Sequence, residues 1–277
     1  MATEGMSAPI KEKSILRLDL SGTLAERSDS NPFAALMGEE NTALSLEDAL
    51  LALDKAAKNE NIIGVYLEGG SMGANPGMAQ ELRQALVEFK ESGKWVVAYG
   101  DSYGKTAYYL SSVADSVLLN PEGNVDFGGM ASQIMFYKDV MEKVGVKMQV
   151  FKVGTYKSAV EPFICTEMSP ANREQVTSYL FSIWTNMLKD VAASRNMEVG
   201  KLNSLADSLT MISEASVALN GGLVDKLCYM DEVKAIGVGI PGIMDQRTGI
   251  VPFCTNLGWH DVPVIERMVE LTGVDDV

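Results

Sequence analysis

The chain has 277 residues, which is enough for one large domain or two small ones. Hydrophobic residues make up 47% and charged residues 22%, an ordinary globular composition that excludes disorder over most of the chain. There are 23 lysines and arginines against 37 aspartates and glutamates, so the net charge of −14 repels phosphate backbones and argues against nucleic acid as a partner.

Cysteine and histidine usage narrows the possible chemistry. Cys165, Cys228 and Cys254 are far apart and odd in number, so they form neither a disulfide framework nor a zinc knuckle. His260 is the single histidine, and most Ser-His-Asp, Cys-His and zinc sites need one in the working domain. If the chain is an enzyme, we expect its proton transfers to fall to lysine, aspartate, glutamate or tyrosine.

The first half of the chain alternates predicted strands and helices. The apolar patterns predict strands at 14–20, 62–67, 95–99 and 116–119. Between them they predict a loop at 21–44, a helix opened by Ser45 and Asp48, a helix from Asn75 to Gly93 and a short helix at 104–113. Asn75 and Pro76 are typical of the cap and first turn of a helix.

The alternation continues in the second half. We predict a helix at 135–144, a strand at 147–153, a long helix from Ser169-Pro170 to about residue 196 and a short helix at 213–220. Such alternation implies right-handed βαβ units and a mostly parallel sheet, which is the α/β class. The amino-acid composition changes near residue 235, because no lysine occurs from there to the end of the chain. Residue 235 is therefore a candidate domain boundary.

Lys157 is the residue most suited to catalysis. It lies within residues 154–163, a rather apolar loop after a predicted strand. Burial disfavours the ammonium form, so a partly desolvated lysine can act as a general base at neutral pH. Paired with a serine, it would replace the histidine that this region lacks. The alternative is that Lys157 is a solvated surface lysine.

Several motifs resemble those of one known family. The chain carries SILRLDLSG at 14–22, FKESGKWVVAYG at 89–100, YYLSSVADSVLL at 108–119, VGTYKSAVEPF at 153–163, SPANREQVTSY at 169–179 and GGLVD at 221–225. In this order they resemble the bacterial signal peptide peptidases, also called protease IV, over residues 14–234. The resemblance implies a Clp protease/crotonase-like fold, a spiral of ββα units. It also implies a serine peptidase with a Ser-Lys dyad that degrades cleaved signal peptides.

In the long form of this family, two similar domains lie in tandem, and the resemblance is to the N-terminal one. It places Lys157 at the general-base position, while the nucleophile belongs to the C-terminal domain. Single-domain members carry their serine three residues before the first aromatic, here Tyr108, and that place holds Lys105. Neither Ser102 nor Ser158 matches the motif. We therefore expect half of an active site, inactive until a second domain or subunit supplies the serine.

The resemblance also implies partners and a location. It implies apolar, extended peptides as substrates and a homo-oligomer that closes the active sites between neighbouring domains. From the residues themselves we expect no cofactor and no metal. It implies an inner-membrane anchor with the catalytic domain outside the cytoplasm. Residues 1–13 form a polar leader without a secretory signal, and no apolar run reaches the roughly 18–20 residues of a membrane span. We therefore expect that the chain begins at a truncation.

Other interpretations stay open. The loop Gly69–Gly73 lies where the family's other half holds oxyanion-binding backbone, but it lacks Ser-Pro-Gly-Gly, so its glycines would serve only a tight turn. A second hypothesis, motivated by the missing serine, is that the domain is a non-catalytic scaffold that binds apolar peptides. A further alternative, an enzyme that acts on acyl-CoA substrates, is supported only by analogy with the crotonase-like spiral fold.

Residues 235–277 resemble a different family. The stretches IGVGIPGIMD at 236–245, TGIV at 248–251 and NLGW at 256–259 resemble sugar kinases and repressors of the ROK family. The chain stops before that family's catalytic Asn-Asp, so the resemblance implies at most a sugar-binding or kinase fragment, foreign to the preceding domain. The pattern GxGxxG at 237–242 formally matches a dinucleotide fingerprint, but Pro241 lies inside it, so no long helix can start there.

Overall fold

The computed structural model describes residues 10–27, 43–208, 210–237, 250–254 and 259–263. The chain divides into two compact units, Met1–Tyr229 and Met230–Val277. The candidate catalytic residues all lie in the first unit.

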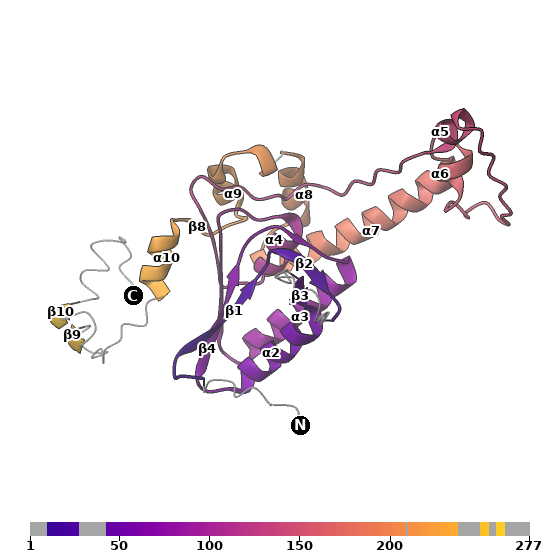
Figure 1. Cartoon of the computed structure of the whole chain (residues 1–277). Coiled ribbons are helices and arrows are strands. Elements are labelled where there is room, and N and C mark those ends of the chain that lie inside the picture. The colour runs from indigo at the N-terminus through magenta and orange to yellow at the C-terminus, as the bar shows by residue number, and fades with distance from the viewer. Residues whose placement is uncertain (1–9, 28–42, 209, 238–249, 255–258, 264–277) are drawn as a thin grey trace, which may run out of the picture. The chain divides into compact units, whose positions relative to one another are not determined.

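A parallel sheet forms the centre of the first unit (Figure 1). Its strand order is β1 (Ser14–Asp19), β4 (Ile62–Glu68), β6 (Trp95–Gly100), β7 (Ser116–Leu119) and β8 (Lys226–Leu227). Every neighbouring pair in this sheet runs parallel. The predicted α/β class with a mostly parallel sheet is therefore confirmed.

A second, smaller sheet completes the spiral. It has the order β3 (Ala43–Ser45), β2 (Gly22–Ala25) and β5 (Met72–Gly73), again with parallel pairing. An isolated parallel bridge between Tyr103 and Val125 continues the pattern after β6 and β7. Strand, short strand and helix thus follow one another, which is the expected ββα repeat. The prediction of a loop over 21–44 was wrong for β2 and β3, because strands this short show too little alternation to be recognised.

Three helices follow the strands. They are α2 (Leu46–Lys58), α3 (Pro76–Glu91) and α4 (Lys105–Ser111). The predicted caps are confirmed: Ser45 Oγ accepts a hydrogen bond from the amide of Asp48 at 3.2 Å, and Asn75 Oδ1 accepts from the amide of Gly77 at 3.0 Å. Apolar side chains of α2 and α3 are buried with those of β4 and β6 in one hydrophobic core.

The helix α7 (Pro170–Arg195) has two different halves. Its C-terminal half joins the core through Trp184, Leu188, Val191 and Ala192, whereas Phe181 and Tyr179 nearer its start are exposed. It begins at the predicted Ser169 cap and ends at Asn196, which has the left-handed φ of 49°. The chain then forms α8 (Val199–Asp207), the short 3₁₀ helix η1 (Thr210–Ile212) and α9 (Ala215–Gly221).

Residues 131–169 form a segment that we call the arm, which carries α5 (Lys138–Lys143) and α6 (Glu161–Ile164). Both helices lie at the N-terminal end of α7 (Figure 1). The predicted strand at 147–153 was wrong, since these residues form no strand in the described chain. Their apolar side chains have no neighbouring strand edge to pack along, and Phe151 is 96% exposed and Val153 90% exposed.

The second unit contains α10 (Met230–Gly237) and an antiparallel pair of strands, β9 (Ile250–Cys254) and β10 (Trp259–Pro263). The sequence pattern predicted none of these three elements. Most of the ROK-like stretches, including 238–249 and 255–258, lie outside the described residues.

Candidate active site

Lys157 lies in the turn between residue 153 and α6, on the arm. Its apolar neighbours predicted partial burial, whereas the side chain is exposed in this single chain. The reason is that Phe151, Val153 and Tyr156 also face solvent rather than packing over it. Lys157 makes no hydrogen bond or ion pair with another described residue. Its amine is therefore accessible to a group brought from outside the chain.

The loop around Lys157 is held by a contact to α7 before the lysine and by a backbone turn after it. On one side, the Tyr156 hydroxyl donates a hydrogen bond to Glu174 Oε2 at 3.1 Å. This interaction raises the pKa of Tyr156. On the other side, the amide of Glu161 donates to the carbonyl of Ser158 at 3.0 Å, closing the turn that leads into α6.

Glu161 is the best-satisfied charged side chain of the arm. Its carboxylate accepts three hydrogen bonds: from the Ser169 hydroxyl at 2.6 Å, the Ser169 amide at 3.1 Å and Asn172 Nδ2 at 2.9 Å. The side chain is only 1% exposed, because these immediate neighbours enclose it. Burial by itself raises the pKa of Glu161, but the hydrogen bonds from Ser169 and Asn172, helped by the charge of Lys152, outweigh it and hold the pKa below its ordinary value.

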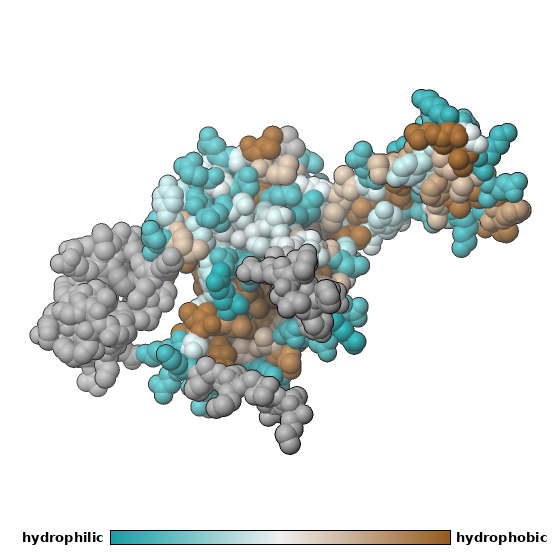
Figure 2. Space-filling model, viewed as in Figure 1, coloured by the Kyte–Doolittle hydropathy of each residue, from teal (hydrophilic) through white to brown (hydrophobic). Residues whose placement is uncertain are grey.

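Aromatic stacking joins the two short helices of the arm. The Tyr137 and Phe163 rings stack with their centroids 6.0 Å apart, and the amide of Tyr137 donates to the Pro162 carbonyl at 2.6 Å. Figure 2 shows hydrophobic residues at the surface around α5 and α6. The lysine loop thus belongs to a locally organised segment whose apolar side chains are nevertheless uncovered.

Lys105, at the position where the sequence resemblance places the nucleophile of single-domain members, begins α4. Its amine donates to the carbonyl of Gly129 at 2.7 Å. It lines a cavity of about 400 Å³ between α3, α4 and α7, whose apolar lining includes Met130, Ile183 and Met187. The structure therefore places a cation, not a hydroxyl nucleophile, at this position.

The loop Gly69–Gly73 packs directly against the start of α4. The amide of Gly104 donates to the carbonyl of Gly70 at 2.8 Å, so at this contact the loop offers an acceptor rather than an oxyanion donor. A Cβ atom on Gly104 would lie 3.1 Å from Ser71 Cα, and one on Gly69 would enter the Tyr103 ring. At Gly69 and Gly70 a Cβ atom would clash with the side chains of Tyr103 and Ser21, which explains these two glycines, and none of the glycines in this loop has a positive φ.

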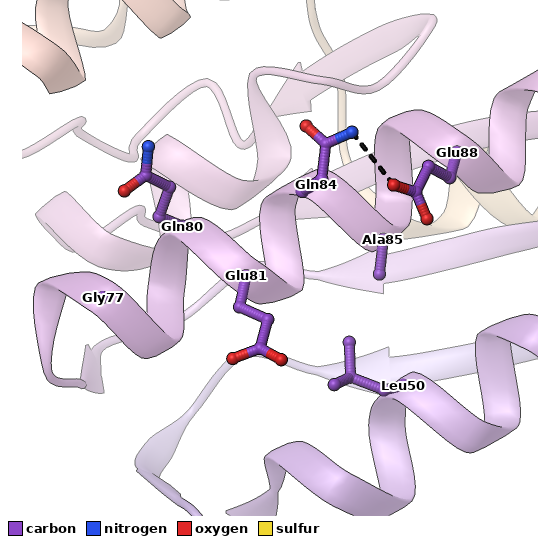
Figure 3. Close-up of a pocket in the computed structure, with 7 residues that line it drawn as sticks. All are labelled: Leu50, Gly77, Gln80, Glu81, Gln84, Ala85 and Glu88. Atoms are coloured by element: carbon purple, nitrogen blue, oxygen red, sulfur yellow. Dashed lines mark hydrogen bonds between the residues drawn. The ribbon is translucent and has the colours of Figure 1, made fainter.

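A second hollow, between α2 and α3, has a more polar lining (Figure 3). In it, Glu81 points toward Leu50 of α2, and Gln84 Nε2 donates to Glu88 Oε1 at 3.1 Å. It holds neither a hydroxyl nucleophile nor a lysine among its lining residues. Nothing in this hollow points to catalysis.

The described residues contain no group of three or more histidine, cysteine, aspartate or glutamate side chains that could hold a metal ion. In the same part of the chain, no helix combines the length and the apolar character that crossing a membrane requires.

The first unit thus combines a ββα spiral with an arm that carries the lysine motif. Residues 88–236, more than half of the chain, match the family described as Peptidase family S49, and the chain belongs to this family. It is 34% identical over 245 residues to Protease 4 of Salmonella typhi, covering 83% of this chain and 40% of that protein. To Protease 4 of Haemophilus influenzae it is 32% identical over 207 residues, covering 71% and 33%. The chain thus spans less than half of either relative.

A solved structure and a further relative complete the comparison. The 1510-N membrane-bound stomatin-specific protease superposes with a TM-score of 0.45 and 10% identity, covering 92% of this chain and 94% of that one. A protein of Caldicellulosiruptor sp., described as a xylose repressor, is 30% identical over 96 residues, covering 34% of this chain and 22% of that protein. The ROK-like character of the tail stays a prediction.

The sequence motif indicated Lys157 but not the residues that hold its loop in place. Glu161 had one available signal: it lies in the same motif as Lys157, shortly before the Ser169-Pro170 helix start. Tyr156 had none, because its contact with Glu174 depends on how the arm folds back onto α7.

Proposed function

We propose that this chain is the lysine-bearing half of a Ser-Lys serine peptidase that degrades cleaved signal peptides. One observation carries the proposal: the side chains of Tyr156 and Glu161, on either side of Lys157, hydrogen-bond to α7 and its cap, while the Lys157 amine makes no hydrogen bond or ion pair with a described residue. A surface lysine without a role needs no such anchoring. A base that must meet a hydroxyl from another domain needs both a fixed position and an open approach.

The chemistry follows from this arrangement. The neutral amine of Lys157 takes the proton from the serine hydroxyl as the oxygen attacks the scissile carbonyl. The resulting ammonium then gives that proton to the leaving amine of the peptide. Covering the loop favours the neutral amine, because burial disfavours the charged form. The serine-bearing domain or subunit would therefore supply both the nucleophile and the environment that activates its base.

The arm offers a surface for that partner. Large apolar side chains are exposed along it, among them Met135, Val140, Val144, Met148, Phe151 and Val153. Contiguous exposed apolar side chains mark interaction surfaces in soluble proteins. We place the serine-bearing half, or a neighbouring copy in a homo-oligomer, on this surface, with apolar extended peptides bound between the two. Family membership also supports an inner-membrane-anchored protein with this domain outside the cytoplasm, which protease accessibility in spheroplasts would test.

The decisive experiment joins this chain to a serine-bearing C-terminal domain and measures hydrolysis of a fluorogenic apolar peptide. Lys157→Ala should lower kcat/KM by about 10²- to 10⁴-fold, the usual contribution of a positioned base. Lys147→Ala, at another exposed lysine of the arm, is the matched control and should retain activity. The chain alone should hydrolyse nothing. Full activity of the joined Lys157→Ala protein would reject the proposal.

The second candidate is a non-catalytic scaffold that binds peptides. Two observations favour it: Lys157 is exposed, and Lys105 stands where a nucleophile would be. Under this alternative, the chain binds an apolar peptide, measurable by fluorescence anisotropy, and the peptide stays intact after the serine-bearing half is added.

A further inference from the structure

We infer that Glu161 is a positioning residue for Lys157, holding the lysine loop on the N-terminus of α7 by a buried carboxylate. The inference rests on the proposed function, since it assigns a role within the same site. Its basis is the geometry of the junction between the arm and α7.

The Glu161 carboxylate provides the negative charge that the first turn of α7 lacks. No acidic residue lies in the first turn of this helix, although helix N-termini favour negative charge. Glu161, eight residues before Ser169 in sequence, brings its charge there and accepts from both the side chain and the amide of Ser169. Ser169 Oγ in turn accepts from the amide of Asn172 at 3.2 Å, so the cap and the carboxylate form one network.

The same residue is bonded to the lysine loop through its backbone. The Glu161 amide donates to the Ser158 carbonyl, the carbonyl of the residue next to Lys157. The Glu161 carbonyl accepts from the amide of Cys165 at 2.8 Å, which fixes α6 in the same unit. A displaced carboxylate would therefore release the turn that sets where the Lys157 amine lies.

The role is positional rather than a direct charge interaction. No hydrogen bond or ion pair joins the carboxylate to Lys157 among the described residues, and its three hydrogen bonds come from Ser169 and Asn172. Loss of Glu161 should accordingly change how often the base meets the serine, and leave peptide binding unchanged.

The test uses the joined protein with both halves and compares Glu161→Ala, Glu161→Gln and Lys157→Ala. Glu161→Ala should lower kcat by about 10- to 100-fold, as misplacement of a catalytic group does, with KM changed less than about twofold. Glu161→Gln should largely rescue kcat, because its amide oxygen can accept from the Ser169 amide and Asn172 while its nitrogen donates to Ser169 Oγ. Glu167→Ala, an exposed glutamate in the same segment, is the matched control and should leave kcat unchanged.

The outcomes separate this inference from the proposed function. An active Lys157→Ala protein would reject the proposed function itself. An inactive Lys157→Ala together with a Glu161→Ala whose kcat equals that of Glu167→Ala would overturn the positioning role alone, and so would a change confined to KM. If Glu161→Ala fails to fold, Asn172→Ala removes a single donor, and it must then lower kcat with KM unchanged for the inference to stand.

Discussion

The guanidinium carbon of Arg83 lies 4.7 Å from the centroid of the Tyr109 ring, at the contact between α3, α4 and α7. Arg83 is 5% exposed and donates to the carbonyl of Asp190 at 2.8 Å and to Ser194 Oγ at 2.6 Å, both on α7. It also donates to Ser112 Oγ at 2.8 Å and to the Tyr109 carbonyl. One buried cation therefore joins the helix that carries the arm to the two helices beneath it.

Replacing this cation should weaken the unit strongly. Arg83→Ala leaves several buried acceptors without donors, so we expect the free energy of unfolding to fall by about 3 kcal/mol. Urea denaturation followed by circular dichroism measures the change. Gln84→Ala, on the exposed face of the same helix, is the control and should cost less than about 0.5 kcal/mol. Equal midpoints for the two variants would contradict this account.

Gly64 should not tolerate a side chain. A Cβ atom there would enter the Trp95 ring on the neighbouring strand, so Gly64→Ala must displace the indole, at a cost of about 1–3 kcal/mol. The displacement should appear as a shift in tryptophan fluorescence. In a Trp95→Val background, the same glycine substitution should lower the free energy of unfolding much less. An equal loss in both backgrounds would show that the clash is not with Trp95.

The Tyr108 hydroxyl binds the segment that leads from α9 into β8. It donates to the Leu223 carbonyl at 2.8 Å, and the whole side chain is buried. Tyr108→Phe leaves that carbonyl unpaired and should lower the free energy of unfolding by about 1–2 kcal/mol in thermal melts. Tyr179→Phe, at an exposed position on α7, should leave the melting temperature unchanged.

The docking of Glu161 on α7 should depend on pH in the acid range. Its pKa is lower in the folded protein than the ordinary 4.5, so the carboxylate stabilises the folded junction above that value. This stabilisation is lost as the pH falls through the lowered folded pKa. The amide proton resonance of Ser169 should report the titration by NMR, with a midpoint below 4.5. Glu161→Gln should abolish that titration, and a midpoint above 4.5 would contradict the hydrogen-bond geometry.

The apolar side chains of the arm should govern association with the serine-bearing half. Phe151→Ser should weaken binding between the separate halves, measured by calorimetry, by about 10- to 150-fold, since burying a phenylalanine contributes about 1.5–3 kcal/mol. The melting temperature should not change, because Phe151 makes no contribution to the core. Ile212→Ser removes a similarly exposed apolar side chain from η1 and should leave the association intact.

Local sequence signals predicted most of the spiral. The caps at Ser45, Asn75 and Ser169 are short-range interactions within three residues of chain, so their sequence pattern is enough to place the helix starts. The buried strands 62–67 and 95–99 were recognisable because parallel strands covered by helices are almost wholly apolar.

Features that depend on distant contacts were not predictable in this way. Residues 147–153 have a strand-like pattern, but a strand also needs a partner edge, and none is present in the described chain. The exposure of Lys157 was missed for the same reason, since apolar neighbours produce burial only when something covers them. The carboxylate network of Glu161 joins residues eight and eleven positions apart through a turn that the sequence alone does not specify.

The length of α7 has a mechanical consequence. Its 26 residues make a rod about 39 Å long, clamped near one end by Arg83 and carrying the lysine loop at the other. Because the core holds the helix from Trp184 onward, about 21 Å of it projects, and a tilt of about 5° would move its far end by about 2 Å. Small movements of the helices that contact Arg83 would thus become larger movements of the Lys157 amine toward the serine or away from it.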